Sequence, residues 1–268
     1  MKYRNDLKYY IKSDQLIPIE EFDESIFDAG ESVYEVVRIQ NGKALFLTEH
    51  LERMQHSLDL IYGNFQCSKS ALQDDFHLLI QANNVNEGNV KIELRKKDNG
   101  FLRLLYFIPH RYPSQEQVEK GIQMRFQFDE RPNPNAKISN WQVRGNANSI
   151  IDEHQIYETL LVNADGFITE GSRSNIFFIK EGRLFSAPEE WILPGITRAK
   201  VLGICKSLDI KVYHQKIHYN ELTQFDAAFI TGTSPGVLQV QNIENRIFEI
   251  NHSRYNQILQ VYSTLSKV

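Results

Sequence analysis

The hydrophobic pattern in the first half of the chain changes period several times, which limits the folds it can adopt. Residues 7–11 and 33–39 are rich in β-branched and aromatic side chains, as strands are. Between residues 48 and 63, apolar side chains recur every three or four positions, which predicts an amphipathic helix with Thr48 as its N-cap. A second helix is expected after Ser70, where four apolar side chains fall on one face: Leu72, Phe76, Leu79 and Ile80.

Turn signals then divide the chain. Asp98-Asn99-Gly100 separates two apolar runs and predicts a β-hairpin, because Asn and Gly tolerate positive φ. The string HRYPSQEQVEKG after Pro109 is polar and contains a proline, as linkers often do. We therefore expect a small N-terminal domain over residues 1–112, an interdomain linker over 113–120, and a larger domain over 121–268.

The second half reads as a series of short strands with one clear helix. It opens with the strand-like run IQMRFQF, and Asp165-Gly166 and Glu181-Gly182 mark later turns. A helix is expected over residues 195–210, after Leu193-Pro194. Because strands and helices do not alternate regularly, the chain is predicted to be α+β rather than a doubly wound parallel sheet.

Composition excludes several classes of partner. The formal net charge is -4 and the basic residues are spread along the chain, so no basic face for nucleic acid is expected. The N-terminus has no apolar run typical of a signal peptide, and no run approaches the ~20 residues of a membrane helix. Cys67 and Cys205 are far apart and are expected to be buried, reduced thiols. These features predict a soluble, cytoplasmic protein without a membrane partner.

Two strings could hold a phosphate group. In ILPGITR, Pro194-Gly195 forms a turn, so Ile196 and Thr197 occupy the first turn of a helix, where N–H groups are unpaired. In TGTSPG, residues 231–236, backbone amides and the Thr233 hydroxyl could wrap a phosphate. Read alone, the first string favours an ordinary capped helix, and the second is equally compatible with a strand-to-strand turn.

A carboxylate follows the strand-like residues 167–169. Glu170 begins a small, polar loop before the next strand. Such a side chain could be a solvated loop charge. If it points inward, it could pair with a protonated heteroaromatic nitrogen and keep that ring electron-withdrawing.

Six strings, taken in order, resemble the signature of class IV aminotransferases, which are fold-type IV pyridoxal-5′-phosphate (PLP) enzymes. They lie between about residues 29 and 240 and are VYEVVR, EHLERM, AKISN, ITEGSRSNIFFI, ILPGITR and TGTS. The family includes branched-chain and D-amino acid aminotransferases and aminodeoxychorismate lyases. The resemblance implies an α+β fold with a small N-terminal α/β domain, a larger mixed, β-barrel-like domain with helices, and a homodimer.

The resemblance also implies roles for individual residues. Lys137, three positions before Asn140, matches the lysine that carries PLP and transfers protons. Arg53 matches the arginine that binds the cofactor phosphate, and Glu170 matches the partner of the pyridine nitrogen. The remaining phosphate contacts are expected from Ile196, Thr197, Gly232 and Thr233. No metal is expected.

On the substrate side, the resemblance is less complete. Tyr34 matches an aromatic residue that lines the substrate side of the site. The candidates for binding the substrate carboxylate are Arg38, Arg95 and Arg144. Trp141 stands where branched-chain enzymes often carry a tyrosine, which leaves the partner of the PLP 3′-oxygen open. No histidine follows Arg95, as it does in D-amino acid enzymes, and the small hydroxyl residues typical of the lyases are absent around VYEVVR.

The expected function is an aminotransferase that moves an amino group between an amino acid, of branched-chain or D type, and a 2-oxo acid. One alternative is an aminodeoxychorismate lyase that releases 4-aminobenzoate and pyruvate. Another is a cofactor-free family member that serves as a binding or regulatory subunit. Stereospecificity and the identities of donor and acceptor are not readable from the sequence.

Overall fold

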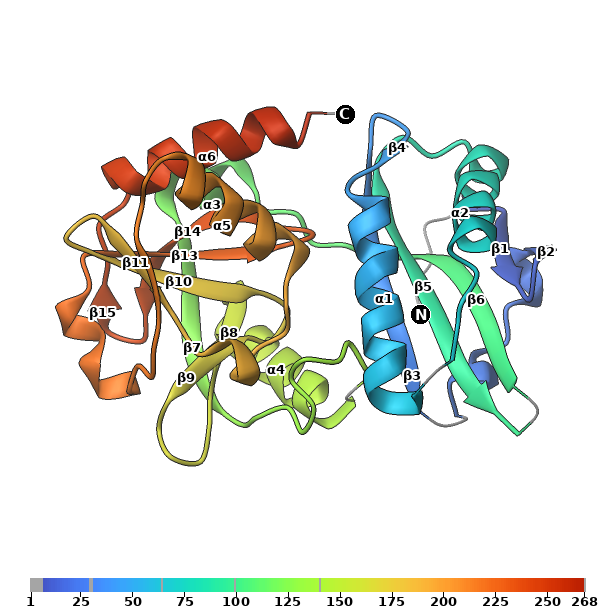
Figure 1. Cartoon of the computed structure of the whole chain (residues 1–268), viewed down its shortest axis with the longest axis horizontal. Coiled ribbons are helices and arrows are strands. Elements are labelled where there is room, and N and C mark those ends of the chain that lie inside the picture. The colour runs from blue at the N-terminus through green and yellow to red at the C-terminus, as the bar shows by residue number, and fades with distance from the viewer. Residues whose placement is uncertain (1–6, 29–30, 64, 99, 140, 268) are drawn as a thin grey trace. The chain divides into compact units, whose positions relative to one another are not determined.

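The computed structural model describes residues 7–28, 31–63, 65–98, 100–139 and 141–267, which Figure 1 traces. These residues form two compact units. The first runs as far as Arg111 and takes in Ala136–Ser139, and the second comprises Tyr112–Asn135 and the chain from residue 141 to Lys267. Lys137 therefore belongs to the first unit. The domain limits of 1–112, 113–120 and 121–268 stay a prediction.

The first unit is built on an antiparallel sheet. Its long central strands pair over most of their length because their alternating apolar side chains share one buried face. The predicted hairpin is present up to the pair Lys97 and Gly100, and Asn99 lies outside the described residues. In order, the strands are β2 (Gln15–Pro18), β1 (Tyr9–Lys12), β6 (Gly100–Ile108), β5 (Gly88–Lys97), β3 (Ser32–Gln40) and β4 (Lys43–Ala44).

Two helices cover one face of this sheet. The helix α1 (Leu47–Tyr62) packs on β3, and α2 (Lys69–Asn83) packs on β1 and β6 (Figure 1). The four apolar residues expected on one face of α2 are all buried, so this prediction is confirmed. The prediction that Thr48 caps α1 is wrong. The helix begins at Leu47, and its N-cap, two residues before Thr48, is Phe46, which adopts a left-handed conformation with φ of 58°.

The second unit is a mixed sheet that curls on itself. β9 stands at one end of the strand order, yet it also contacts β10, which lies well inside that order. Apolar side chains from both regions meet in one core, as they do in a partly closed barrel. The order is β12 (Val212–His214), β11 (Arg183–Ser186), β10 (Asn175–Lys180), β13 (Ala227–Gly232), β14 (Gly236–Ile243), β7 (Ile122–Phe128), β8 (Glu158–Val162) and β9 (Ile168–Gly171), with β15 (Arg246–Ile247) on β14.

Helices of the second unit include the one expected near residue 195, α5 (Ile196–Ser207). Two further helices were not predicted from the sequence: α4 (Trp141–His154), which packs on β7 and β8, and α6 (Ser253–Leu265), which packs on α5 and β14. Residues within the expected linker form a short helix, α3 (Gln115–Lys120), that Ser114 caps. Among the residues that the structure describes, the short 3₁₀ segments are Ile19–Glu21, Glu24–Asp28, Glu189–Trp191 and Tyr219–Gln224.

Taken together, the two sheets and their helices confirm the predicted α+β class. The turns at Gly166 and Gly182 are also confirmed, since both residues have positive φ. Both cysteines are free thiols, but only Cys205 is buried, whereas Cys67 is half-buried. Among the described helices, none has the length and apolar character needed to span a membrane.

Candidate functional site

Lys137 is held at the edge of the first sheet by its backbone. Its carbonyl accepts a hydrogen bond from the Tyr34 amide at 3.0 Å, and its own amide donates to the Ser57 hydroxyl at 3.0 Å. Ile138 forms a bridge with Val33, so the segment runs antiparallel to β3. The half-buried Lys137 side chain places its ammonium nitrogen 4.7 Å from the centre of the Tyr34 ring. The structure thus brings together two of the predicted site residues, Lys137 and Tyr34.

Arg53 lies on α1, on the other face of β3. Its Nε and Nη2 donate to the two carboxylate oxygens of Glu35, at 2.7 and 2.6 Å, and His50 Nδ1 lies 2.7 Å from the same carboxylate. Although burial opposes ionisation of Glu35, the Arg53 charge lowers the pKa of this carboxyl to about 2. Burial lowers the pKa of His50. The expected phosphate ligand is therefore fixed by a buried carboxylate that sequence reasoning missed.

The opposite face of β3 and β5 carries a cluster of charges. Glu93 is fully buried, and its oxygens accept from Arg95 at 2.6 Å, from Lys91 at 2.9 Å and from Tyr106 at 2.7 Å. Arg95 is also fully buried, and its Nη2 donates to the carbonyl of Phe27 at 2.8 Å. Arg95, expected as a substrate ligand, thus binds protein groups in this conformation.

The other two arginine candidates lie in different units. Arg38 is half-buried on β3, and the period of a strand places it on the same face as Tyr34. Arg144 lies on α4 in the second unit, where it donates to the carbonyl of Ser172 at 3.4 Å. Asn140 and the side chain of Trp141 lie outside the described residues, so the partner of the 3′-oxygen stays open.

Glu170, in the second unit, is buried at the end of β9. One carboxylate oxygen accepts from Asn175 Nδ2 at 3.1 Å and from the Leu193 amide at 3.1 Å, and the other lies 3.4 Å from Arg131 Nε. Asn175 also donates to the carbonyl of Leu193 at 2.9 Å. Glu170 therefore points inward, as the resemblance implies, and hydrogen bonds fix its orientation. Asn175 and Arg131 were not among the site residues predicted from the sequence.

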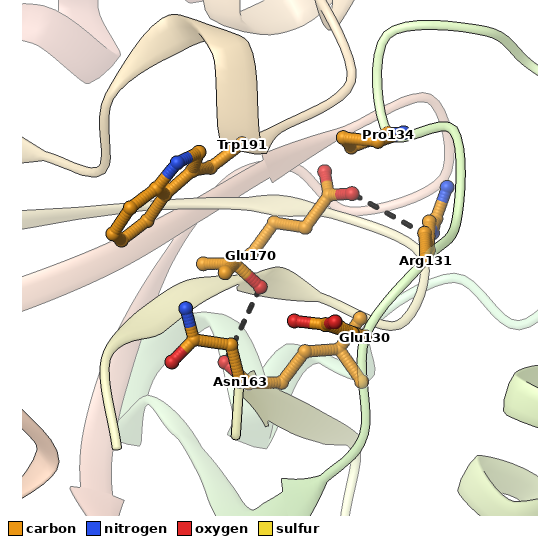
Figure 2. A pocket seen from close by; sticks show the side chains of 8 residues that line it. Glu130, Arg131, Pro134, Asn163, Glu170 and Trp191 are labelled. Atoms are coloured by element: carbon orange, nitrogen blue, oxygen red, sulfur yellow. Dashed lines mark hydrogen bonds and ion pairs between the residues drawn. The ribbon is translucent and has the colours of Figure 1, made fainter. Parts of the chain in front are cut away.

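A pocket of about 140 Å³ opens beside this carboxylate (Figure 2). Figure 2 shows Glu170 directed toward Arg131, with Trp191 on the other side of the pocket. Arg131 also donates to the carbonyl of Ser172 at 2.7 Å, which fixes its side chain. The lining residues are Glu130, Arg131, Pro134, Leu161, Asn163, Thr169, Glu170 and Trp191.

The expected phosphate contacts come from the start of α5 and from the β13–β14 turn. Gly195 caps α5 without a side chain, so the first-turn amides of Ile196 and Thr197 have no partner within the helix. A Cβ on Gly195 would lie 2.1 Å from Asn175 Oδ1, so only glycine fits there. Gly232 and Thr233 are half-buried at the end of β13.

A buried hydroxyl, that of Thr231, lies on the same face of the second unit's sheet as Asn175. Thr231 stands opposite Asn175 in the β10–β13 pair, and its Oγ1 is buried without a partner among the described residues. Opposed residues of an antiparallel pair project to the same side. A buried polar atom without a partner is costly in a folded protein, and a bound anionic group would satisfy it.

The loop between β9 and β10 is shaped by a second buried carboxylate. Glu158 accepts from the hydroxyl of Ser172 at 2.6 Å and of Ser174 at 3.2 Å, and from the amide of Arg173 at 3.1 Å. These bonds hold the loop that joins Glu170 to Asn175. The GSRS part of the sequence string thus has a structural role.

Comparisons with known proteins match one family along most of the chain. The family described as amino-transferase class IV matches residues 32–243. A branched-chain-amino-acid aminotransferase-like protein of Arabidopsis thaliana is 25% identical over 87% of this chain, which spans 45% of that protein's length. The D-alanine aminotransferase of Bacillus licheniformis is 28% identical over 82% of this chain and 81% of its own length.

Solved structures support the same fold. The branched-chain aminotransferase of Escherichia coli superposes with a TM-score of 0.86 at 21% identity, over 97% of this chain and 95% of that one. A Legionella pneumophila protein described as a 4-amino-4-deoxychorismate lyase superposes with a TM-score of 0.80 at 22% identity, over 94% of this chain and 97% of that one. The PLP form of a branched-chain aminotransferase of Thermobaculum terrenum superposes with a TM-score of 0.83 at 19% identity, over 98% of this chain and 95% of that one.

Proposed function

Since the chain belongs to the class IV aminotransferase family, we propose that it is a PLP-dependent aminotransferase acting on an amino acid and a 2-oxo acid. One observation supports this most strongly. The carboxylate expected to meet the pyridine nitrogen is hydrogen-bonded to Leu193, and the segment from Leu193 leads directly into the first turn of α5. Glu170 and the first turn of α5 are therefore held close together within one unit, as a cofactor with two polar ends requires.

The residues present fit this cofactor. Glu170 is a buried carboxylate suited to a protonated ring nitrogen, and α5 offers amides suited to a phosphate. The partnerless Thr231 hydroxyl is a further donor on the same sheet face. When bound, PLP supplies an electron sink for the carbanion formed at the substrate Cα.

Lys137 is the proposed catalytic residue. Its primary amine can carry the cofactor covalently and, once displaced by the substrate amine, act as base and acid. It would take the proton from the substrate Cα and deliver it to C4′ of the cofactor. The backbone hydrogen bonds to Tyr34 and Ser57 restrict the origin of this side chain, so the amine moves only by rotation of its own torsions.

Glu170 would keep a proton on the ring nitrogen by accepting a hydrogen bond from it. Its position depends on Asn175 and the Leu193 amide, and the positive charge of Arg131 lies beside its second oxygen. These contacts would hold the carboxylate in position before the cofactor binds.

We further propose that Thr197, Gly232 and Thr233, with the amide of Ile196, bind the phosphate, and that Arg53 contributes a guanidinium N–H. Glu35 would orient this guanidinium, because its two oxygens accept from Nε and Nη2 at the same time. The homodimer and the cytoplasmic location stay predictions.

The test is a spectrum followed by a donor panel. Purified protein incubated with PLP should be yellow, and Lys137→Ala should lack the absorbance of the covalently bound cofactor. Branched-chain L-amino acids and D-alanine are then offered with 2-oxoglutarate or pyruvate, and the new amino acid is measured. A protein that stays colourless with excess PLP would contradict the proposal and favour a cofactor-free binding subunit.

A lyase remains the second candidate, because a protein described as a 4-amino-4-deoxychorismate lyase shares the fold over nearly the whole chain. In that reaction Lys137 would still transfer the protons, but the substrate would lose a leaving group from its β-carbon. Release of 4-aminobenzoate and pyruvate from aminodeoxychorismate, with every amino donor inert, would favour the lyase.

A further inference from the structure

Two lysines from distant parts of the sequence share one aromatic ring. The Nζ of Lys137 lies 4.7 Å from the centre of the Tyr34 ring, and the Nζ of Lys91 lies 4.8 Å from the same point. These two distances limit the separation of the ammonium nitrogens to less than about 10 Å. The aromatic residue that we place at the substrate thus has a second cation beside it.

Lys91 projects from β5 into the charge cluster around Glu93. In the described part of the chain, Glu93 is the only carboxylate within salt-bridge distance of Lys91. This carboxylate is shared, because it also accepts from Arg95, Ser32 and Tyr106. An ammonium group has three donors, so Lys91 can still bind a second anion.

Accessibility distinguishes the two cations of the cluster. The side chain of Arg95 is 0% exposed, and Glu93 and the Phe27 carbonyl both accept from it. The side chain of Lys91 is 14% exposed, and its ammonium reaches the ring of Tyr34. A small molecule beside Tyr34 would therefore meet Lys91 rather than Arg95.

We propose that Lys91 binds a carboxylate of the substrate and so determines which acids this enzyme accepts. The proposal rests on the function proposed above, because Lys137 and Tyr34 mark the substrate side through it. An ammonium with limited solvent contact binds a carboxylate through a charge-assisted hydrogen bond. The aromatic rings of Tyr34, Tyr106 and Phe27 surround its nitrogen at 4.8, 5.8 and 6.0 Å and hold it in place.

The carboxylate could belong to either end of the substrate. Every amino acid and 2-oxo acid has a carboxylate next to the reacting carbon, and a dicarboxylic acid has another at the far end. Both are the same chemical group, so the probes must separate them. We choose 4-methylpentanoate, which has one carboxylate and no amino group, and glutarate, which has two.

The experiment measures binding by calorimetry to the PLP-loaded protein, so it does not depend on turnover. Each acid is compared with its neutral amide, 4-methylpentanamide or glutaramide. The variants are Lys91→Met and Lys91→Arg. Lys96→Met is the matched control, because Lys96 is exposed on the same strand and points to the other face.

We expect the loss of the Lys91 ammonium to weaken binding of the charged acids but not of the neutral amides. Lys91→Met should raise the Kd of at least one acid about tenfold or more, which is typical for loss of a hydrogen bond to a charged group. The Kd of the amides should stay within about twofold, and Lys91→Arg should recover most of the acid affinity. An effect on both acids assigns Lys91 to the carboxylate beside the reacting carbon, and an effect on glutarate alone assigns it to the far carboxylate.

Several results would overturn the proposal. An unchanged Kd for both acids, or equal weakening of acid and amide, would show that Lys91 only supports the sheet. Should Lys91→Met not fold, Lys91→Gln is used with the same criteria. A coloured, transaminating protein with unchanged acid binding refutes this inference alone, whereas a protein that never binds PLP refutes the proposed function as well.

Discussion

Arg53 and Glu35 form a two-pronged ion pair inside the first unit, with Nε to Oε1 at 2.7 Å and Nη2 to Oε2 at 2.6 Å. The pair joins α1 to β3, and the glutamate is completely buried. It fixes the helix that carries Ser57, whose hydroxyl accepts from the amide of Lys137. The buried ion pair is thus linked, through α1 and Ser57, to the backbone of the proposed catalytic residue Lys137.

We predict that Glu35→Gln destabilises the protein strongly. The substitution leaves the Arg53 guanidinium buried without its counter-charge, and breaking a buried pair typically costs about 3–5 kcal/mol. Urea unfolding measures the loss. Glu116→Gln is the control, because it removes an exposed pair with Lys120 and should leave the midpoint unchanged. Equal midpoints for both variants would contradict the importance of the buried pair.

Glu35 should also make the free energy of unfolding depend on pH. Its pKa falls from 4.5 to about 2 on folding, so its stabilising contribution is complete above about pH 5. The contribution is lost as the pH falls through 4.5 toward 2, because the unfolded chain binds the proton first. The difference in unfolding free energy between wild type and Glu35→Gln should therefore be largest near neutral pH and shrink in acid. A difference that does not vary with pH would be evidence against this pKa shift.

Gly195→Ala should weaken cofactor binding, although it adds a single methyl group. The new Cβ would lie 2.1 Å from Asn175 Oδ1, so Asn175 or the start of α5 must move, and Asn175 positions Glu170. We expect a rise in the Kd of PLP of about tenfold or more, measured by absorbance titration. Gly203→Ala in the same helix has open space around it and should leave the Kd unchanged while stabilising the helix by about 0.5–1 kcal/mol.

Glu170→Gln should separate cofactor binding from catalysis. Asn175 and the Leu193 amide can still donate to the remaining carbonyl oxygen, so the side chain should keep its place. The ring nitrogen would lose its anionic partner, and kcat should fall about 100-fold or more while the protein stays coloured. Glu130→Gln, an exposed residue of the same pocket, is the control. A Glu170→Gln enzyme with normal kcat would remove Glu170 from the mechanism.

Local sequence signals predicted the fold class, the α2 face and the turns well, because spacing and turn residues act over a few positions. They did not predict α4, in which Val143, Ala147 and Ile151 are buried at four-residue spacing but Gly145 and several polar residues stand between them. The contacts that were missed are long-range. Glu35 meets a helix 18 residues away, and Asn175 meets Leu193 18 residues away. Nothing in the local pattern of either residue identifies its partner.

The position of Lys91 beside Tyr34 also could not be predicted from the local sequence. In the sequence it is one of several charges in a strand, and the arginines nearby were the stronger carboxylate candidates. The fold buries Arg95 against Glu93 and places the Lys91 ammonium at the Tyr34 ring. Pairing across β3 and β5 decides this, and a single strand cannot reveal it.

The account depends most on the covalent role of Lys137, which chemical trapping tests directly. The PLP-loaded protein is reduced with borohydride, digested, and mapped by mass spectrometry. We predict that the phosphopyridoxyl group is found on the peptide containing Lys137, and that Lys137→Ala carries none. Modification of another lysine in the wild-type protein, with Lys137 unmodified, would contradict the account.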